Sequence, residues 1–250
     1  GLAIADFDND GNLDVATANS SGDNISFLSG IGDGTFDVES DIPIGGRPLS
    51  TALGDFDSDG DLDIVSASFD GGISIVYGND DGSFGNQAVF TGIFNHIDLA
   101  TGDLNNDDVL DVVTAAPSSI AILLGNGDGT LASSPTTVKA GGRDSIALGD
   151  LNEDGNLDVV TTGFGSNGNA VVLFGNGDGT FAPSQSFAVG LADDEVWVGD
   201  ANGDDHLDLI TVGSNTVAVQ LGNGDGTFLP LVQFTGGGSS RQGLDVEDLN

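Results

Sequence analysis

The sequence predicts an all-β protein, a β-propeller made of four-stranded antiparallel blades, and three observations support this fold class. A nine-residue segment rich in aspartate recurs with a period of 47 to 50 residues along the 250-residue chain. A glycine-rich segment follows each complete copy, and short apolar runs flank both segments. Internal repeats of this length without a helical period are typical of propellers, in which each repeat forms one small sheet.

The order of signals within a repeat predicts four strands. A short apolar run such as Ile146 to Gly149 precedes the acidic segment and is expected to form the innermost strand. A run such as Leu110 to Thr114 follows as the second strand, and a variable polar stretch leads to a third strand such as Ala121 to Gly125. The glycine-rich segment then reverses the chain into an outer fourth strand, because Gly and Asp-Gly supply the positive φ angles of tight turns.

This order divides the chain into repeats that together form one propeller domain, residues 1–250. The predicted repeats are residues 1–49, 50–97, 98–145, 146–194 and 195–242, with a partial sixth repeat at 243–250. The sixth acidic segment starts at Asp248, and residues 243–250 match residues 1–8. Two strands would compete for one innermost place in a closed ring of five, so we expect the chain to be part of a larger ring and of a longer protein.

The innermost strands carry their own pattern. Positions four and two before each acidic segment are mostly apolar, as with Val196 and Val198, and the positions between are mostly Ala or Gly. Small residues at alternate positions suit the crowding near a propeller axis.

The acidic segments have the spacing of cation-binding loops. Oxygen-bearing side chains stand at positions 1, 3, 5 and 9, which lets one turn contribute to the about six to eight oxygens that Ca²⁺ prefers. Gly11, Gly60 and Gly155 at position 6 permit a sharp turn, and Asp108 and Asp205 at the same place should tolerate a left-handed backbone. The backbone carbonyl of position 7 is expected to be a fifth protein ligand. The predicted metal ligands are Asp6, Asp8, Asp10, Asn12 and Asp14; Asp55, Asp57, Asp59, Asp61 and Asp63; Asp103, Asn105, Asp107, Val109 and Asp111; Asp150, Asn152, Asp154, Asn156 and Asp158; and Asp200, Asn202, Asp204, His206 and Asp208.

Five such loops at a fixed phase argue against simple acidic turns, because carboxylates packed this closely would repel one another without a cation. We therefore predict one structural Ca²⁺ per complete repeat, five in all. Mg²⁺ fits less well because it keeps its water shell. Asn105, Asn152 and Asn202 replace Asp at position 3, which should weaken those three sites. The side chain of His206 should point to solvent.

Composition excludes several classes of function. Asp and Glu total 40 against 4 Lys and Arg, a formal charge of −36, which disfavours nucleic acid and anionic membrane surfaces as partners. No apolar stretch approaches the ~18 residues of a membrane helix, and cysteine is absent. No nucleophile with a matching base can be defined, so we expect no catalytic residue and no enzyme. The charge suits a saline or calcium-rich milieu, where self-repulsion is screened.

A second group of residues should lie on the face opposite the cation loops. The arginines precede alternate acidic segments, and His96 and Asp193 stand at comparable places in the repeats between them. Trp197 occupies a position that is mostly Ala elsewhere. Two interpretations stay open, a site for an anionic or sugar ligand, and simple pairing or packing within the fold. The candidate ligand face is Arg47, His96, Arg143, Trp197 and Arg241.

The pairing of a DxDxDGxxD-type loop with a downstream GxGDGTF turn resembles the FG-GAP and VCBS-type repeats. This family includes integrin α-subunit propeller blades and some fungal and bacterial propeller lectins, and the resemblance covers essentially the whole chain. It implies a ring of six or seven blades and a calcium-stabilised binding or adhesion module for a glycan or a surface protein, in an extracellular or cell-surface location. Two alternatives stay open. One is a structural subunit of an extracellular filament or surface layer that self-assembles through the terminal strand; the other is a polysaccharide-acting enzyme domain, which needs a carboxylate pair outside the loops.

Overall fold

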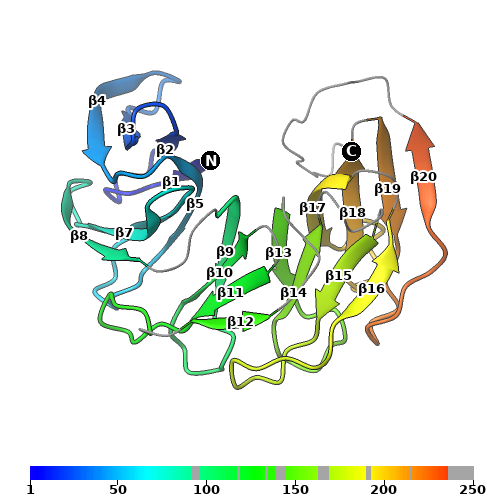
Figure 1. Ribbon diagram of the computed structural model, residues 1–250. Coiled ribbons are helices and arrows are strands. Elements are labelled where there is room, and N and C mark those ends of the chain that lie inside the picture. Colours follow the sequence, from blue (N-terminus) through cyan, green and yellow to red (C-terminus); the bar gives the residue numbers. More distant parts are fainter. Residues whose placement is uncertain are drawn as a thin grey trace. The chain divides into compact units, whose positions relative to one another are not determined.

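Each of the five complete repeats forms one four-stranded antiparallel sheet, with the strands side by side in chain order (Figure 1). The computed structural model describes residues 1–91, 96–116, 119–132, 135–138, 145–162, 169–189, 193–213 and 215–235. These residues contain no helix, and so none that is long and apolar enough to span a membrane. The predicted all-β fold with four strands per repeat is confirmed.

The sheets are numbered 1 to 5 after their repeats. Sheet 1 comprises β1 (Leu2–Ala5), β2 (Asp14–Asn19), β3 (Asn24–Gly30) and β4 (Phe36–Pro43). Sheet 2 comprises β5 (Pro48–Gly54), β6 (Asp63–Ser68), β7 (Gly72–Gly78) and β8 (Phe84–Phe90). Sheet 3 comprises β9 (Asp98–Gly102), β10 (Asp111–Ala116), β11 (Ser119–Leu123) and β12 (Thr136–Val138). Sheet 4 comprises β13 (Ser145–Gly149), β14 (Asp158–Thr162), β15 (Asn169–Leu173) and β16 (Gln185–Ala188). Sheet 5 comprises β17 (Asp193–Gly199), β18 (Asp208–Gly213), β19 (Thr216–Gln220) and β20 (Val232–Thr235).

The sheets belong to two compact units. The first contains residues 1–101, 108–116 and 121–136, and the second contains residues 102–107, 117–120 and 137–250. Sheets 1 and 2 lie wholly in the first unit and sheets 4 and 5 in the second. Sheet 3 has residues in both units.

Burial falls from the second strand of a sheet to its fourth. Every residue of β6, β10 and β14 is buried, and these strands are runs of β-branched and small residues such as DVVTT in β14. The fourth strands are mostly exposed, as in β16 and β20. A continuous apolar run is the pattern of a strand covered on both faces, whereas a polar outer strand is tolerated at an edge.

The core of each unit lies between consecutive sheets. Buried apolar side chains of sheets 1 and 2 form one cluster, those of sheets 2 and 3 a second, and those of sheets 4 and 5 a third. In the first cluster Phe7, Phe27 and Phe84 meet edge to face, with ring centroids 4.9 to 5.7 Å apart. This geometry suits the quadrupoles of the rings and adds to the burial of apolar area. Packing of sheet against sheet therefore fixes the ends of the strands and the loops that join them.

The innermost strand of sheet 1 departs from the predicted pattern. Leu2 and Ile4 are 62% and 53% exposed, whereas Ala3 between them is 9% exposed. In sheet 5 the equivalent Val196 is only 6% exposed, because it packs in the cluster with sheet 4. The two apolar positions of an innermost strand thus face the preceding sheet, and among the described residues no sheet covers this side of β1.

Candidate metal centres

The acidic loops join the first and second strands of each sheet and share one backbone conformation. They are loop 1 (residues 6–14), loop 2 (55–63), loop 3 (103–111), loop 4 (150–158) and loop 5 (200–208). Position 6 has a positive φ in all five, including Asp108 at 64° and Asp205 at 69°, so the predicted left-handed turn is confirmed there. Position 4 also has a positive φ, which the sequence analysis missed. The residues at position 4 are Asn9, Ser58, Asn106, Glu153 and Gly203, with φ from 55° to 80°.

Left-handed backbone favours Gly, Asn and Asp. At position 4 the residue type alone could have indicated a left-handed backbone at Asn9, Asn106 and Gly203, but not at Ser58 and Glu153.

The carboxylate at position 1 shapes the turn by accepting hydrogen bonds from backbone N–H groups. In loop 1 the N–H of Asp10 donates to Asp6 Oδ1 at 3.1 Å and the N–H of Gly11 donates to Oδ2 at 2.9 Å. In loop 4 the same bonds reach Asp150 at 3.0 and 2.8 Å. Several N–H groups therefore point toward the inside of the loop, where they hold the carboxylates in place.

The aspartate at position 9 has a role that the sequence analysis did not assign. Asp14 is fully buried; its Oδ2 accepts from the N–H of Phe7 at 2.8 Å and its Oδ1 from the N–H of Gly30 at 2.7 Å. Phe7 lies in the loop, and Gly30 opens the glycine-rich turn of the same repeat. Asp63, Asp158 and Asp208 make the same pair of bonds in their repeats. Position 9 therefore ties each loop to its own turn, in addition to its predicted place as a ligand.

Carboxylates converge in loops 1 and 2. Asp6, Asp8 and Asp14 each offer an oxygen, and these oxygens lie within 4.8 Å of one another. Asp55, Asp57 and Asp63 form the equivalent group in loop 2. Position 5, predicted as a ligand, is not part of either close group. The three-carboxylate arrangement suits a hard divalent cation, which takes oxygen ligands.

One oxygen in loop 2 supports a cation at this place. Oδ1 of Asp57 is buried and has no hydrogen-bond partner among the described groups. Burial, followed by the charge of Asp59, raises the pKa of Asp57. Burial also raises the pKa of Asp63 to about 6. Buried carboxylate oxygens are costly without a partner, and a cation would supply one.

In loops 3, 4 and 5, position 3 is asparagine, and its amide donates a hydrogen bond to the carboxylate at position 5. The Nδ2 of Asn105 donates to Oδ2 of Asp107 at 2.9 Å, and the Nδ2 of Asn152 donates to Oδ2 of Asp154 at 3.0 Å. Asn202 makes the same 2.9 Å bond in loop 5. An amide at position 3 thus partly satisfies the position 5 carboxylate in these loops. Loops 1 and 2 have a carboxylate at position 3 instead, and in loop 1 the Nδ2 of Asn12 at position 7 donates to Oδ2 of Asp10 at 2.9 Å.

Position 7 contributes its backbone N–H to the turn. This group donates to the position 5 carboxylate in loops 1, 2, 4 and 5 over 2.7 to 3.0 Å, from Asn12, Asp61, Asn156 and His206. Whether the backbone carbonyls at position 7, including that of Val109, bind a metal is not tested and stays a prediction.

Side chains at positions 4 and 7 link consecutive loops. The Nδ2 of Asn106 donates to Oδ1 of Asn156 at 2.8 Å, which joins loop 3 to loop 4. His206 pairs with Glu153, which joins loop 4 to loop 5. The prediction that the side chain of His206 points to solvent is therefore only partly right, since it is 37% exposed but paired. The hydrogen bond that the Glu153 carboxylate accepts from the imidazole raises the pKa of His206.

The glycine-rich turns also contact the loop of the preceding repeat. The N–H of Gly129 donates to the carbonyl of Phe56 at 2.9 Å, and the N–H of Gly226 donates to the carbonyl of Leu151 at 3.0 Å. Within a turn, Asp178 accepts from the N–H of Thr180 at 3.0 Å, and the Thr180 hydroxyl lowers the pKa of Asp178. The hairpin-turn interpretation is thus supported, and each such loop is held between two turns.

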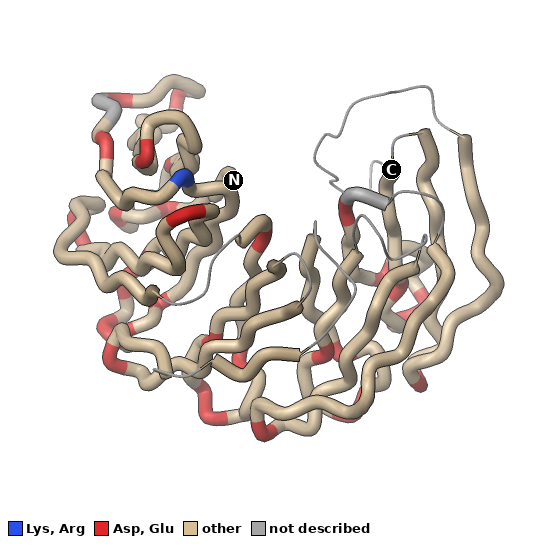
Figure 2. The backbone as a smooth tube through the Cα atoms, viewed as in Figure 1, with Lys and Arg blue, Asp and Glu red and all other residues tan. Residues whose placement is uncertain are grey.

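At the other end of sheet 2, Arg47 contacts two neighbouring side chains of its own repeat. Its guanidinium lies 3.5 Å from Asp70 and 4.8 Å from the ring centroid of Phe69. Both charged side chains are more than half exposed, so the ion pair itself adds little stability. Arg47 is the one Lys or Arg in the described part of the chain, amid many acidic residues (Figure 2).

The other candidate ligand-face residues divide by accessibility. His96 is fully buried, with its Nδ1 2.8 Å from Oγ1 of Thr114, so it is a core residue and is not available on an exposed face. Trp197 is partly buried and its ring lies over Gly199 on the same strand. Arg143 and Arg241 lie outside the described residues, as does the side chain of Asp193.

Comparison with known proteins matches both the repeats and the fold. A family model described as FG-GAP-like repeat matches residues 6–66, 55–114, 103–161 and 150–211. No curated protein matches the chain. A lectin of Agrocybe aegerita that recognises non-reducing terminal N-acetylglucosamine has a similar structure, with a TM-score of 0.66 and 22% identity over 95% of this chain and 66% of the lectin.

A second similar structure is the biofilm matrix protein Bap1 of V. cholerae. Its TM-score is 0.53, at 21% identity over 95% of this chain and 40% of Bap1. The chain thus spans less than two thirds of both solved proteins. At these identities the likeness shows the fold alone, a β-propeller type of sheet packing.

Proposed function

The chain belongs to the FG-GAP-like repeat family, and from this premise we propose that it is a calcium-stabilised extracellular module that binds a glycan or a surface protein. The observation that carries the calcium part is the convergence of Asp6, Asp8 and Asp14, and of Asp55, Asp57 and Asp63, within 4.8 Å in loops 1 and 2. The unpartnered buried oxygen of Asp57 adds to it.

The role proposed for the cation is structural. The loop carboxylates already accept N–H groups of their own turn and of the glycine-rich turn, so a bound cation would stabilise the junction between strands. At about 1 mM Ca²⁺ and a Kd of about 10⁻⁴ M, each site adds roughly 1.4 kcal/mol to the free energy of unfolding. Five sites together approach the net stability of an ordinary domain.

Recognition is proposed to lie away from the loops, because their polar groups are engaged in the fold. The Agrocybe lectin and the V. cholerae matrix protein are compatible with a glycan or a surface protein as the partner class. The end of sheet 2 that carries Arg47 and Phe69 offers a cation and an aromatic ring side by side, two groups that sugars and acidic sugars contact. The proposal assigns no catalysis to the domain.

Two measurements test the two halves separately. Calorimetric titration of the EDTA-treated chain with CaCl₂ is expected to show binding with about five sites, and no heat of binding would remove the calcium part. Glycan-array binding in CaCl₂ is expected to give ligands that Arg47→Ala weakens, with Arg47→Lys retaining part of the signal. If no glycan on the array binds, the partner should be sought among proteins. If a glycan binds equally well to the Arg47→Ala variant, the end of sheet 2 that carries Arg47 is not the binding site.

A further inference from the structure

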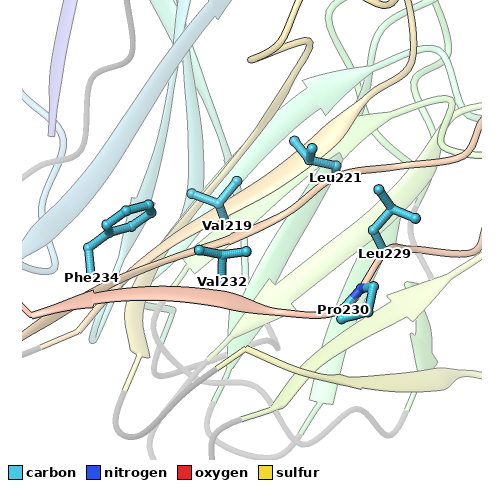
Figure 3. A pocket seen from close by; sticks show the side chains of 6 residues that line it. All are labelled: Val219, Leu221, Leu229, Pro230, Val232 and Phe234. Carbon is cyan, nitrogen blue, oxygen red and sulfur yellow. The ribbon is translucent and has the colours of Figure 1, made fainter.

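Sheet 5 carries an apolar groove that no other described part of the chain fills. The groove has a volume of about 370 Å³ and is lined by Val219, Leu221, Leu229, Pro230, Val232 and Phe234 (Figure 3). Val232 and Phe234 of β20 are 51% and 57% exposed. Figure 3 shows the six side chains gathered together. Contiguous exposed apolar surface of this kind marks a contact surface.

In three of the other sheets the equivalent region packs against one residue of the following repeat, the residue that ends its glycine-rich turn. Phe84 ends the turn of repeat 2, and its ring centroid lies 4.9 Å from that of Phe27 in β3. Phe228 ends the turn of repeat 5, and its ring centroid lies 4.9 Å from that of Phe187 in β16. Leu131 ends the turn of repeat 3 and is buried in the cluster of sheets 2 and 3. The turn residue thus reaches the third and fourth strands of the preceding sheet, whereas a first strand such as β17 contacts the first two strands, β13 and β14.

The groove residues are the equivalents of the residues that receive these turns. Phe27 and Val219 each stand three residues before the glycine that opens the turn. Phe187 and Phe234 each pair with the residue that stands five before that glycine. Val219 pairs with Val232, two residues from Phe234, so all three side chains project from one face of sheet 5. The groove therefore has the form of a site for the turn residue of a following sheet, and no described sheet follows sheet 5 in the chain.

Sheet 1 presents a turn residue that no described sheet covers. Phe36 ends its glycine-rich turn and is 47% exposed. The equivalent residues of the other four repeats are all partly or fully buried; they are Phe84, Leu131, Phe181 and Phe228.

Other apolar side chains of the first repeat extend this face. Leu2, Ile4 and Leu13 are each more than half exposed. In sheet 5 the equivalent residues pack in the cluster with sheet 4; they are Val196, Val198 and Leu207. Among the described residues, the exposed large apolar side chains gather in repeat 1 and around the groove, with Val89 apart from both.

We propose that the groove of sheet 5 is the docking site for sheet 1 of a second copy of this chain, so that copies associate head to tail. Phe36 of one copy enters the groove of the other, while Leu2 and Ile4 lie over the first two strands of sheet 5, as β17 lies over β13 and β14. The contact continues between copies the packing of sheet on sheet that the chain repeats within itself. Because the two faces differ, the interface is heterologous, and repetition of it gives a ring or a filament.

A backbone hydrogen bond accompanies the turn in three pairs of consecutive repeats. The N–H of a glycine donates to the carbonyl at position 2 of the preceding loop over 2.9 to 3.0 Å; the pairs are Gly129 with Phe56, Gly179 with Leu104, and Gly226 with Leu151. The equivalent groups across the proposed interface are the N–H of Gly34 and the carbonyl of Ala201. Gly34 has a φ of 87°, against 75° to 79° in the three donor glycines, so its turn has the same conformation.

Charge determines the conditions under which the copies associate. Each copy carries a formal charge of −36, which opposes association. Salt screens this repulsion and leaves the apolar contact, so association should strengthen from about 0.1 M to about 1 M NaCl. An interface made by ion pairs would weaken instead.

Sedimentation velocity of the full chain in CaCl₂ and about 1 M NaCl measures the association. The wild type is expected to form dimers and larger species as its concentration rises. Phe36→Ser, which alters the face of sheet 1, and Val232→Ser with Phe234→Ser, which alters the groove, should each weaken association at least about tenfold, because burial of large apolar side chains is lost. The matched control is Val89→Ser, since Val89 is also 47% exposed but lies outside both faces; it should leave association unchanged.

A mixture of the two variants tests the head-to-tail arrangement. The Phe36→Ser chain keeps its groove, and the Val232→Ser, Phe234→Ser chain keeps its sheet 1 face. An equimolar mixture is therefore expected to form a dimer of one copy of each variant and nothing larger, although each variant alone stays monomeric at the same concentration.

Four results would overturn the proposal. The first is a wild type that stays monomeric at every concentration and both salt concentrations. The second is a Phe36→Ser chain that associates like the wild type while the groove variant does not, which would mean that two grooves face each other. The third is an equal loss of association in the Val89→Ser control, and the fourth is a mixture that stays monomeric although the wild type associates. If either variant fails to give the wild-type far-UV spectrum, Leu13→Ser replaces Phe36→Ser and Leu229→Ser replaces the groove variant, with the same expected results.

Discussion

Among the predicted ligand positions, only position 3 consistently separates loops 1 and 2, which have Asp, from loops 3, 4 and 5, which have Asn. That position changes how a loop balances its charge. Asp8 and Asp57 bring a third carboxylate close to positions 1 and 9. Asn105, Asn152 and Asn202 instead donate an amide hydrogen to the neighbouring carboxylate. The turn itself is the same, with positive φ at positions 4 and 6 in every loop.

The difference teaches that the turn can keep its form while its charge changes. Positions 1, 5 and 9 are aspartate in all five loops, and the oxygen of position 3 accepts from the N–H of position 5 both as Asp in loop 1 and as Asn in loops 3 and 4. Position 3 sets how strongly the finished turn needs a cation, because like charges at short range repel unless a counter-charge is present. Loops 1 and 2 should therefore depend on calcium more than loops 3, 4 and 5.

The largest expected effect is the removal of calcium. EDTA should lower the melting temperature by more than about 10 °C, since five sites at roughly 1.4 kcal/mol each are lost. Hydrogen exchange should increase most in peptides that cover residues 6–14 and 55–63, and less in those that cover 150–158 and 200–208. The control is MgCl₂, which should restore little. An unchanged melt in EDTA would contradict the structural role of the cation, and equal exchange in all loops would contradict the comparison.

Position 9 should be equally sensitive in the two classes of loop. Asp63→Asn and Asp158→Asn each place an amide NH₂ against one of two backbone N–H donors, at Phe56 and Gly78 or at Leu151 and Gly175. Each variant should lose about 1–3 kcal/mol of unfolding free energy, measured by urea denaturation, because a buried donor is left without an acceptor.

The matched control for position 9 is Asp178→Asn in an exposed turn, which should cost less. A much larger loss for Asp63→Asn than for Asp158→Asn in the absence of calcium would show that position 9 acts differently in the two classes.

A swap at position 3 tests the comparison directly. Asp57→Asn should raise the metal-free stability by about 0.5–1 kcal/mol, because the amide can donate to Asp59 as Asn152 does to Asp154. It should also weaken calcium at loop 2 by about tenfold, since one ligand charge is lost. Asn152→Asp should have the opposite effects at loop 4. Chemical denaturation in EDTA and calcium titration of both variants provide the measurements, and changes of the same sign in the two variants would refute the assignment.

Much of the fold and of the loop geometry could be predicted from the sequence. The features that could not be predicted depend on contacts between segments that are distant in the chain. The period, the four strands per repeat and the left-handed turn at Asp108 and Asp205 followed from spacing and local chemistry. The tie between Asp14 and Gly30 did not, because it depends on which end of the third strand lies beside the loop. Contacts between repeats, such as the pair His206 and Glu153, depend on sheet packing and carry no local signal. Burial of His96 was missed for the same reason.

Acidity should affect the metal-free protein in both loop classes. Burial raises the pKa of Asp63 and of Asp158 to about 6. Between about pH 4 and 6 the folded state then holds protons that the unfolded state has released, so the stability falls as pH rises through this window and levels off above it. In calcium the cation competes with those protons, and stability should instead rise over the same window. Thermal melts at several pH values, in EDTA and in CaCl₂, measure these opposite pH dependences. The same pH dependence of the melting temperature in both solutions would contradict competition between protons and the cation at position 9.

The smallest expected effect concerns the link between loops 4 and 5. Glu153 raises the pKa of His206 by accepting its hydrogen bond, so the pair is formed at low pH and is lost as pH rises through the raised pKa of His206. Glu153→Gln should lower that pKa toward the ordinary value, as NMR titration of the imidazole would measure. Because both side chains are exposed, the melting temperature should hardly change. The control is Asn106→Ala, which breaks the neighbouring link between loops 3 and 4 and should leave the pKa of His206 unaltered. A large loss of stability from Glu153→Gln would mean that contacts between loops, and not mainly the packing of sheet against sheet, hold consecutive repeats together.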